Sequence, residues 1–136
     1  MSNELILIIE DHEKNRKLVR EVLQVTGYRT LEAETAEEGI RLAREAEPAL
    51  ILMDLQLPGM DGFAALAALR ADTATKTIPV IAVTASAMHH QRPQILAAGF
   101  DGYQTKPLAV REFLEGVRAV LDRGVRIAAS TSRGQL

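Results

Sequence analysis

Short apolar runs recur along the chain at the length of strands, and segments of helical character separate them. Residues 5–9, 50–53 and 79–83 are apolar throughout, and runs of this length without alternation are typical of strands buried on both faces. Residues 28–33 and 101–105 mix polar with apolar side chains, which predicts weaker strands. The pattern therefore predicts three central strands and two outer ones.

Helical spacing fills the segments between these strands. Residues 35–38, Thr-Ala-Glu-Glu, form a capping box that opens the second helix, and Gly27 is expected to end the first. A fourth helix is predicted over residues 89–98. The expected inward-facing residues are Leu18, Val22 and Val25, with Val19 and Leu23 beside them, in the first helix; Phe63, Leu66 and Leu69 in the third; and Val110, Phe113, Leu114, Val117 and Leu121 in the last.

Five strands alternate strictly with five helices, and this alternation predicts an α/β fold with a parallel sheet covered by helices on both faces. Right-handed crossovers leave few topologies. A flavodoxin-like, doubly wound (βα)5 three-layer sandwich with strand order 2-1-3-4-5 places the three most apolar strands at the centre. Residues 1–122 are expected to form this one domain. Residues 123–136 lack periodicity and are interpreted either as a flexible tail or as a truncated linker.

Composition and charge exclude several classes of function. The chain has 136 residues with 16 Lys and Arg against 18 Asp and Glu, a net charge of −2, which argues against a nucleic-acid binder with a basic surface. It has no Cys, so thiolate chemistry is absent. Neither a signal peptide nor an apolar run of the roughly 18 residues that span a bilayer is evident. We therefore expect a cytoplasmic protein with no nucleic-acid or membrane partner.

Three carboxylates follow the first and third predicted strands. Glu10 and Asp11 come directly after residues 5–9, and Asp54 ends the run that starts at residue 50. These strands are neighbours in the expected order, so their carboxyl ends meet at the edge where open α/β sheets bind ligands. Clustered carboxylates repel one another, and a divalent cation with all-oxygen ligands relieves that repulsion. The sequence therefore predicts a Mg²⁺ site.

The fourth and fifth strands bring a hydroxyl and an ammonium group to the same edge. Thr84 ends the fourth strand and Lys106 follows the fifth. Beside a metal site, these groups suit a phosphoryl group, whose transfer depends on positioning and charge neutralisation. Asp54 is then expected to be the nucleophile that forms an acyl phosphate, while Lys106 and Thr84 bind phosphoryl oxygens.

The motif set resembles the receiver domain of two-component response regulators over residues 4–122. The elements that carry the resemblance are Glu10-Asp11, Asp54 with Leu57-Pro58-Gly59 and Gly62, Thr84-Ala85, and Lys106-Pro107. The resemblance implies that Asp54 is the phosphoacceptor and that Asp11, Asp54 and the main-chain carbonyl of Gln56 bind Mg²⁺, with Glu10 completing the acidic pocket. It also implies a cis Lys106–Pro107 bond and a switch formed by Thr84 and Tyr103.

Within this family, the segments around residues 10–18, 51–58 and 83–88 are most similar to DivK-type single-domain regulators. The resemblance implies a phosphorelay protein rather than a turnover enzyme. A phosphohistidine on a histidine kinase or a histidine phosphotransfer protein would be the donor. The signal would pass to a downstream protein through the face formed by the fourth helix, fifth strand and fifth helix, and a homodimer stays open.

Other classes of protein fit less well. A haloacid-dehalogenase-type phosphatase also uses an Asp after a strand but needs a second Asp two residues on, where this chain has Gln56. A flavodoxin needs a phosphate-binding loop rich in Ser, Thr and Gly after Ile9, which is missing. A receiver module acting with a hybrid histidine kinase remains an alternative, as does a pseudo-receiver that works without phosphate.

Overall fold

A computed structural model describes residues 3–85 and 91–123, and in it the chain forms the predicted alternation of strands and helices. The predicted start of the fourth helix, the pair His89-His90 and the segment beyond residue 123 lie outside the described residues. The elements are β1 (Leu5–Ile9), α1 (Glu13–Val25), β2 (Arg29–Ala33), α2 (Ala36–Ala46), β3 (Leu50–Asp54), α3 (Gly62–Ala71), β4 (Val80–Thr84), α4 (Gln91–Ala98), β5 (Gly102–Thr105) and α5 (Val110–Arg123).

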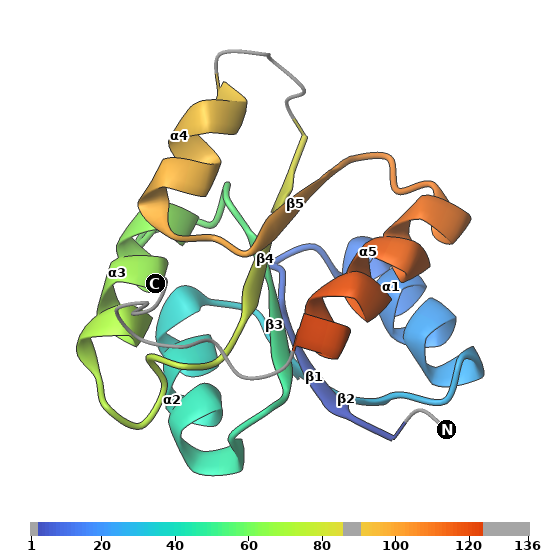
Figure 1. The fold of residues 1–136 in the computed structure, drawn as a ribbon, viewed down its shortest axis with the longest axis horizontal. Helices are drawn as coiled ribbons and strands as arrows, with labels where there is room; N and C mark the ends of the chain where they lie inside the picture. Colours follow the sequence, from blue (N-terminus) through green and yellow to red (C-terminus); the bar gives the residue numbers. More distant parts are fainter. Residues whose placement is uncertain (1–2, 86–90, 124–136) are drawn as a thin grey trace.

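The five strands form one sheet in the order β2-β1-β3-β4-β5, and every pairing is parallel. Helices α2, α3 and α4 cover one face of this sheet, and α1 and α5 cover the other (Figure 1). The predicted α/β class and the strand order are therefore confirmed. Strands β1, β3 and β4 lie at the centre, where helices bury both faces, which explains their apolar sequences.

Each face of the sheet has its own hydrophobic core. On the side of α2, α3 and α4, the core includes Ile9, Met53 and Leu66, while on the side of α1 and α5 it includes Ile8, Leu52 and Phe113. Neighbouring residues of one strand thus serve opposite cores, because side chains alternate across a strand. Because β1 and β3 pack against both cores, the packing of the sheet determines where these strands end.

The prediction for the buried face of α1 was wrong for Leu18 and Val25, although Val19 and Leu23 are buried as predicted. Leu18 and Val25 are 48% and 88% exposed, whereas the residues that α1 buries are Arg16, Val19 and Leu23. These three have the 3–4 spacing of one helical stripe. The apolar pattern did not indicate the whole stripe, because one of its residues, Arg16, is charged. Leu18 and Val25 instead line an open apolar groove that α1 forms with α5.

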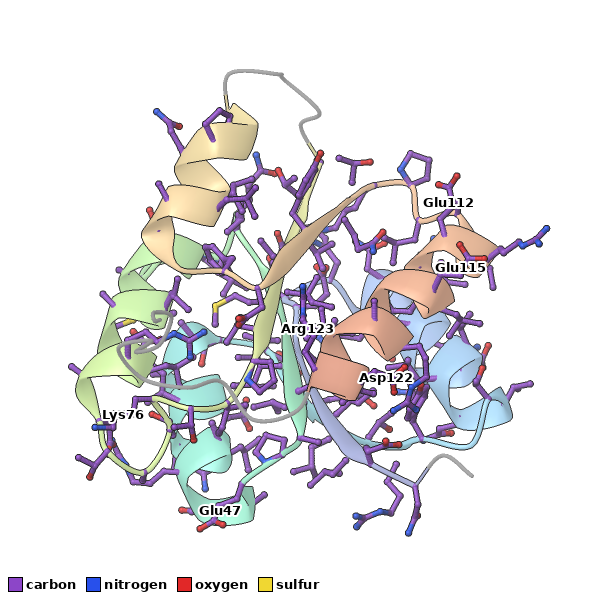
Figure 2. The ribbon with its side chains drawn as sticks, viewed as in Figure 1. Glu47, Lys76, Glu112, Glu115, Asp122 and Arg123 are labelled. Atoms are coloured by element: carbon purple, nitrogen blue, oxygen red, sulfur yellow. The ribbon has the colours of Figure 1, made fainter. Side chains whose placement is uncertain are left out.

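Two further predicted core residues are partly exposed. Phe63 of α3 is 38% exposed, although Leu66 and Leu69 are buried as predicted, and its ring packs edge-on against Phe100 at a centroid distance of 5.7 Å. Val110, at the first turn of α5, is 49% exposed. Further along α5, Glu112 and Glu115 lie on its outer surface (Figure 2), so this helix is amphipathic as predicted.

Candidate functional site

The carboxyl ends of β1, β3, β4 and β5 bring the predicted site residues to one edge of the sheet. Glu10 follows β1, Asp54 ends β3, and Thr84 ends β4. Lys106 follows β5, and its main-chain N–H donates to the Thr84 carbonyl at 2.8 Å. Parallel register fixes these positions, since Thr84 pairs with Thr105 directly before Lys106. The peptide bond between Lys106 and Pro107 is cis, as the resemblance implied.

Lys106 connects the acids of two strands. Its Nζ lies 2.9 Å from Oε1 of Glu10 and 3.0 Å from Oδ2 of Asp54. Both acids are buried, with 5% and 3% exposure. Burial by itself lowers the pKa of the Lys106 ammonium, but its hydrogen bonds to Glu10 and Asp54 outweigh that effect and raise the pKa. The structure therefore holds a fixed positive charge directly beside the Asp54 carboxylate.

The second oxygen of Asp54 is held by the loop that follows β3. The main-chain N–H of Gln56 donates to Asp54 Oδ1 at 2.9 Å. Gly62 makes this compact loop possible, because a Cβ atom there would lie 2.9 Å from Cα of Leu55 and 3.1 Å from the Asp54 carbonyl oxygen. A larger residue at position 62 would push the loop away. Both Asp54 oxygens are thus oriented by partners from outside β3.

Asp11 supplies the feature that fits a cation. Its Oδ1 atom is shielded from solvent and accepts no hydrogen bond in the part of the chain that the structure describes. A buried carboxylate oxygen without a donor is unfavourable unless a cation approaches it. Among the described residues, one group of three side chains has metal-ligating atoms within 4.8 Å of one another. It consists of Glu10, Asp11 and His12. The two carboxylates of this set fit a hard divalent cation such as Mg²⁺.

The two predicted switch residues lie beside this edge. Thr84 is 3% exposed, and it lines a small cavity together with Gln56 and Ile95. Tyr103 is half-buried and packs against the core on the side of α2, α3 and α4. It pairs in register with Ala82, two residues before Thr84. The structure thus places a hydroxyl and an aromatic ring on neighbouring strands.

Arg16 is a site-supporting residue that the sequence interpretation missed. Its side chain, 11% exposed, donates from Nη1 to the Glu10 carbonyl at 2.9 Å and from Nε to Glu32 at 3.2 Å. Arg16 thereby anchors the end of β1, and with it the main chain from which the Glu10 and Asp11 side chains project. The sequence could have indicated this buried position, because Arg16 has helical spacing to the apolar residues Val19 and Leu23.

Replacing Arg16 by Met should destabilise the fold by about 2 kcal/mol, because a buried charged hydrogen bond to the Glu10 carbonyl is lost. Arg20→Met is a matched control, since Arg20 is more exposed and also pairs with Glu32, at 2.7 Å. A partly exposed pair of this kind contributes about 1 kcal/mol or less. Urea unfolding followed by circular dichroism measures both changes. Equal losses for the two variants would contradict the special role of Arg16.

The fold and this edge define a flavodoxin-like α/β domain with an acidic site at the carboxyl ends of its strands. The family model of the response regulator receiver domain matches residues 6–118, and the chain belongs to this family. It is 40% identical over 116 residues to the polar-differentiation response regulator DivK of Brucella ovis, covering 85% of this chain and 94% of that protein. The chain is thus a relative of single-domain response regulators of two-component signalling.

Solved structures of receivers have the same fold. The receiver domain of the sensor histidine kinase PA1611 from Pseudomonas aeruginosa PAO1 is 30% identical, with a TM-score of 0.81 over 88% of this chain and 98% of that one, and its active-site cleft coordinates a magnesium ion. The Vibrio cholerae chemotaxis protein CheY4 is 25% identical, with a TM-score of 0.81 over 87% and 98% of the two chains.

None of the described helices has the length and apolar character of a membrane span.

Proposed function

We propose that Asp54 is the phosphoacceptor of this receiver and takes a phosphoryl group from a phosphohistidine. The observation that carries the proposal is the contact of Lys106 Nζ with Asp54 Oδ2 at 3.0 Å. A phosphoryl group on that oxygen would have its own oxygens within reach of the same ammonium. Positioning and charge neutralisation of this kind are what phosphoryl transfer requires.

The reaction needs one bond to form and one to break. Oδ2 of Asp54 attacks phosphorus, and the bond between phosphorus and the donor imidazole nitrogen breaks, leaving its electron pair on that nitrogen. Lys106 then shifts toward the phosphoryl oxygens, and the Thr84 hydroxyl donates to another of them. Gln56 holds Oδ1 through its main-chain N–H, which keeps the carboxylate oriented while Oδ2 reacts.

A Mg²⁺ ion fits the same edge. Asp11, Asp54 and the main-chain carbonyl of Gln56 are the proposed ligands, and Glu10 completes the acidic pocket. The ion supplies positive charge that offsets the repulsion between the attacking carboxylate and the phosphoryl oxygens. Oδ1 of Asp11 is shielded and accepts no hydrogen bond from a described residue, which supports Asp11 as a direct ligand.

The new charge at Asp54 would alter the surface of α4, β5 and α5. When Thr84 moves to the phosphoryl group, space opens near β4 and Tyr103 can turn inward, which biases an equilibrium between two conformations. Helix α5 lies close to β5, since a Cβ atom at Gly116 would meet the Gln104 amide at less than contact distance. A change in β5 can therefore reach a downstream protein that binds this face.

A stand-alone role in a phosphorelay agrees with the 40% identity to DivK over most of both chains. The donor would be a histidine kinase or a histidine phosphotransfer protein, and residues 1–122 would act as the receiver with 123–136 as its tail. A role beside a hybrid histidine kinase is the second candidate, because receiver domains of histidine kinases match this chain at 28–30% identity.

Acetyl phosphate tests the proposal directly. Incubated with Mg²⁺ and acetyl phosphate, the protein should gain the mass of one phosphoryl group, and peptide mapping should place it on Asp54. Omitting Mg²⁺ or adding a chelator should suppress the gain, because the carboxylates would then repel the donor. No mass gain in Mg²⁺, or a gain on another residue, would overturn the proposed function.

A further inference from the structure

Helices α1 and α5, which cover the same face of the sheet (Figure 1), form an open groove with apolar walls. The apolar side chains that line it are Leu18, Val22 and Val25 of α1 and Val110 and Leu114 of α5. Three of them are strongly exposed: Val25 at 88%, Val110 at 49% and Leu18 at 48%. A cluster of exposed apolar side chains marks a surface that binds another apolar group.

The segment that follows α5 in the sequence matches this groove in composition. Residues 125–129 read Val-Arg-Ile-Ala-Ala, and residues 124–136 contain two Arg and no Asp or Glu. Among the described residues that line the groove, the charged one is Glu21, so the charges of the segment and the groove are complementary. Because α5 is one wall of the groove, a segment attached to its end is present there at a high effective concentration.

The segment is long enough to reach the groove. Helix α5 ends at Arg123, and at about 1.5 Å per residue Leu114 lies roughly 13 Å back along the helix. An extended chain covers about 3.3 Å per residue, so about four residues beyond the helix span that distance. The first residue after α5 is Gly124, and glycine is the residue that most readily lets a chain reverse at the end of a helix.

We propose that residues 125–129 bind in the groove between α1 and α5 and cover it. Val125 and Ile127 are two positions apart, so in an extended segment they share one face and contact the apolar walls of the groove. Arg126 lies on the other face, where its long side chain reaches Glu21 at the rim. The occupant of the exposed apolar surface is thus a part of the same chain.

A segment in this groove would also lie beside the phosphoacceptor edge. Leu18 lines both the groove and the cavity that extends to Asp54 and Lys106. The covered groove would restrict the approach of a large protein donor to that edge, whereas a small donor such as acetyl phosphate would still enter. Only this consequence rests on the proposed function, because the contact between the segment and the groove does not involve Asp54.

The test uses the full chain carrying Val25→Cys, because the sequence contains no other Cys. The covered thiol should react with a maleimide at least about fivefold more slowly than in the same protein carrying also Val125→Asp and Ile127→Asp, since reaction requires the segment to open. A matched variant carrying Thr131→Asp and Ser132→Asp adds the same charge outside the apolar run and should keep the slow rate.

Leu96→Cys is the control for the reagent. Leu96 is 48% exposed on α4, which covers the opposite face of the sheet (Figure 1), so a thiol there should react equally fast with either sequence at positions 125 and 127. Equal rates at position 25 with and without the two Asp substitutions would overturn the inference. Protection that disappears on dilution would also overturn it, because a second copy of the chain would then be the occupant.

Acetyl phosphate separates this inference from the proposed function. With Mg²⁺ it should modify Asp54 to the same extent in the protected and unprotected proteins, since a small donor does not cross the groove. If Asp54 is modified but the thiol is never protected, the proposed function stands and the inference fails. If the thiol is protected but Asp54 is not modified, the segment occupies the groove and the proposed function fails.

Discussion

Asp54→Asn is expected to abolish phosphoryl transfer to this protein. The amide has nearly the shape of the carboxylate, and its oxygen can still accept the Gln56 N–H that now lies 2.9 Å from Oδ1. It has no anionic oxygen to attack phosphorus, however, so no acyl phosphate can form. Intact-mass measurement after incubation with acetyl phosphate and Mg²⁺ should show the unmodified variant beside a modified parent.

Asp61→Asn is the matched control for this change. Asp61 lies in the loop after β3, and its Oδ1 accepts the Ala64 N–H at 2.9 Å as the N-cap of α3. Asn caps helices as well as Asp does, so this variant should fold and be phosphorylated like the parent. A phosphoryl adduct that persists in Asp54→Asn would show that another residue is the acceptor.

Lys106→Met is expected to impair both phosphorylation and folding. Removing the ammonium eliminates the charge that would bind the phosphoryl group, which should lower the rate with acetyl phosphate by about a hundredfold. It also leaves Glu10 and Asp54 buried without their shared cation. Unpaired buried charges are strongly unfavourable. Because the Lys106 side chain is 22% exposed and solvent screens part of the interaction, we expect the unfolding free energy to fall by about 2 kcal/mol.

The effect of Lys106 on stability should depend on pH in one direction. Its pKa is raised in the folded protein, so its contribution is fully present below the unfolded-state pKa of about 10.4. That contribution is lost as the pH rises through the folded-state pKa. The difference in unfolding free energy between the parent and Lys106→Met should therefore be constant from about pH 7 to 9 and shrink above roughly pH 10.5.

Urea unfolding at several pH values measures this difference, and Lys17→Met is a suitable control. Lys17 lies on the exposed face of α1, so its replacement should change the unfolding free energy by less than about 0.5 kcal/mol. A Lys106→Met protein as stable as its parent at pH 7 would show that the buried carboxylates do not depend on this ammonium. Unchanged phosphorylation would remove Lys106 from the proposed mechanism.

The sequence by itself determined the architecture, because the physics involved is local and periodic. Short apolar runs such as residues 50–53 are typical of strands covered on both faces, and strict alternation with helices leaves a parallel sheet with few allowed connections. The same rules bring the ends of parallel strands to one edge. The proximity of Glu10, Asp54, Thr84 and Lys106 could therefore be predicted before any coordinate was known.

Only the tertiary structure decided which side chains touch and which residues complete the buried face of α1. Arg16 lies in the buried stripe of α1 while Leu18 is exposed, because Glu32 on β2 and the Glu10 carbonyl accept the guanidinium hydrogens. No period along the chain encodes partners that distant. The turn of His12 toward the acids was equally hidden, since a rotamer depends on neighbours in space. The sequence pattern therefore determines the fold and the strand order, and packing between distant segments determines the contacts at the site.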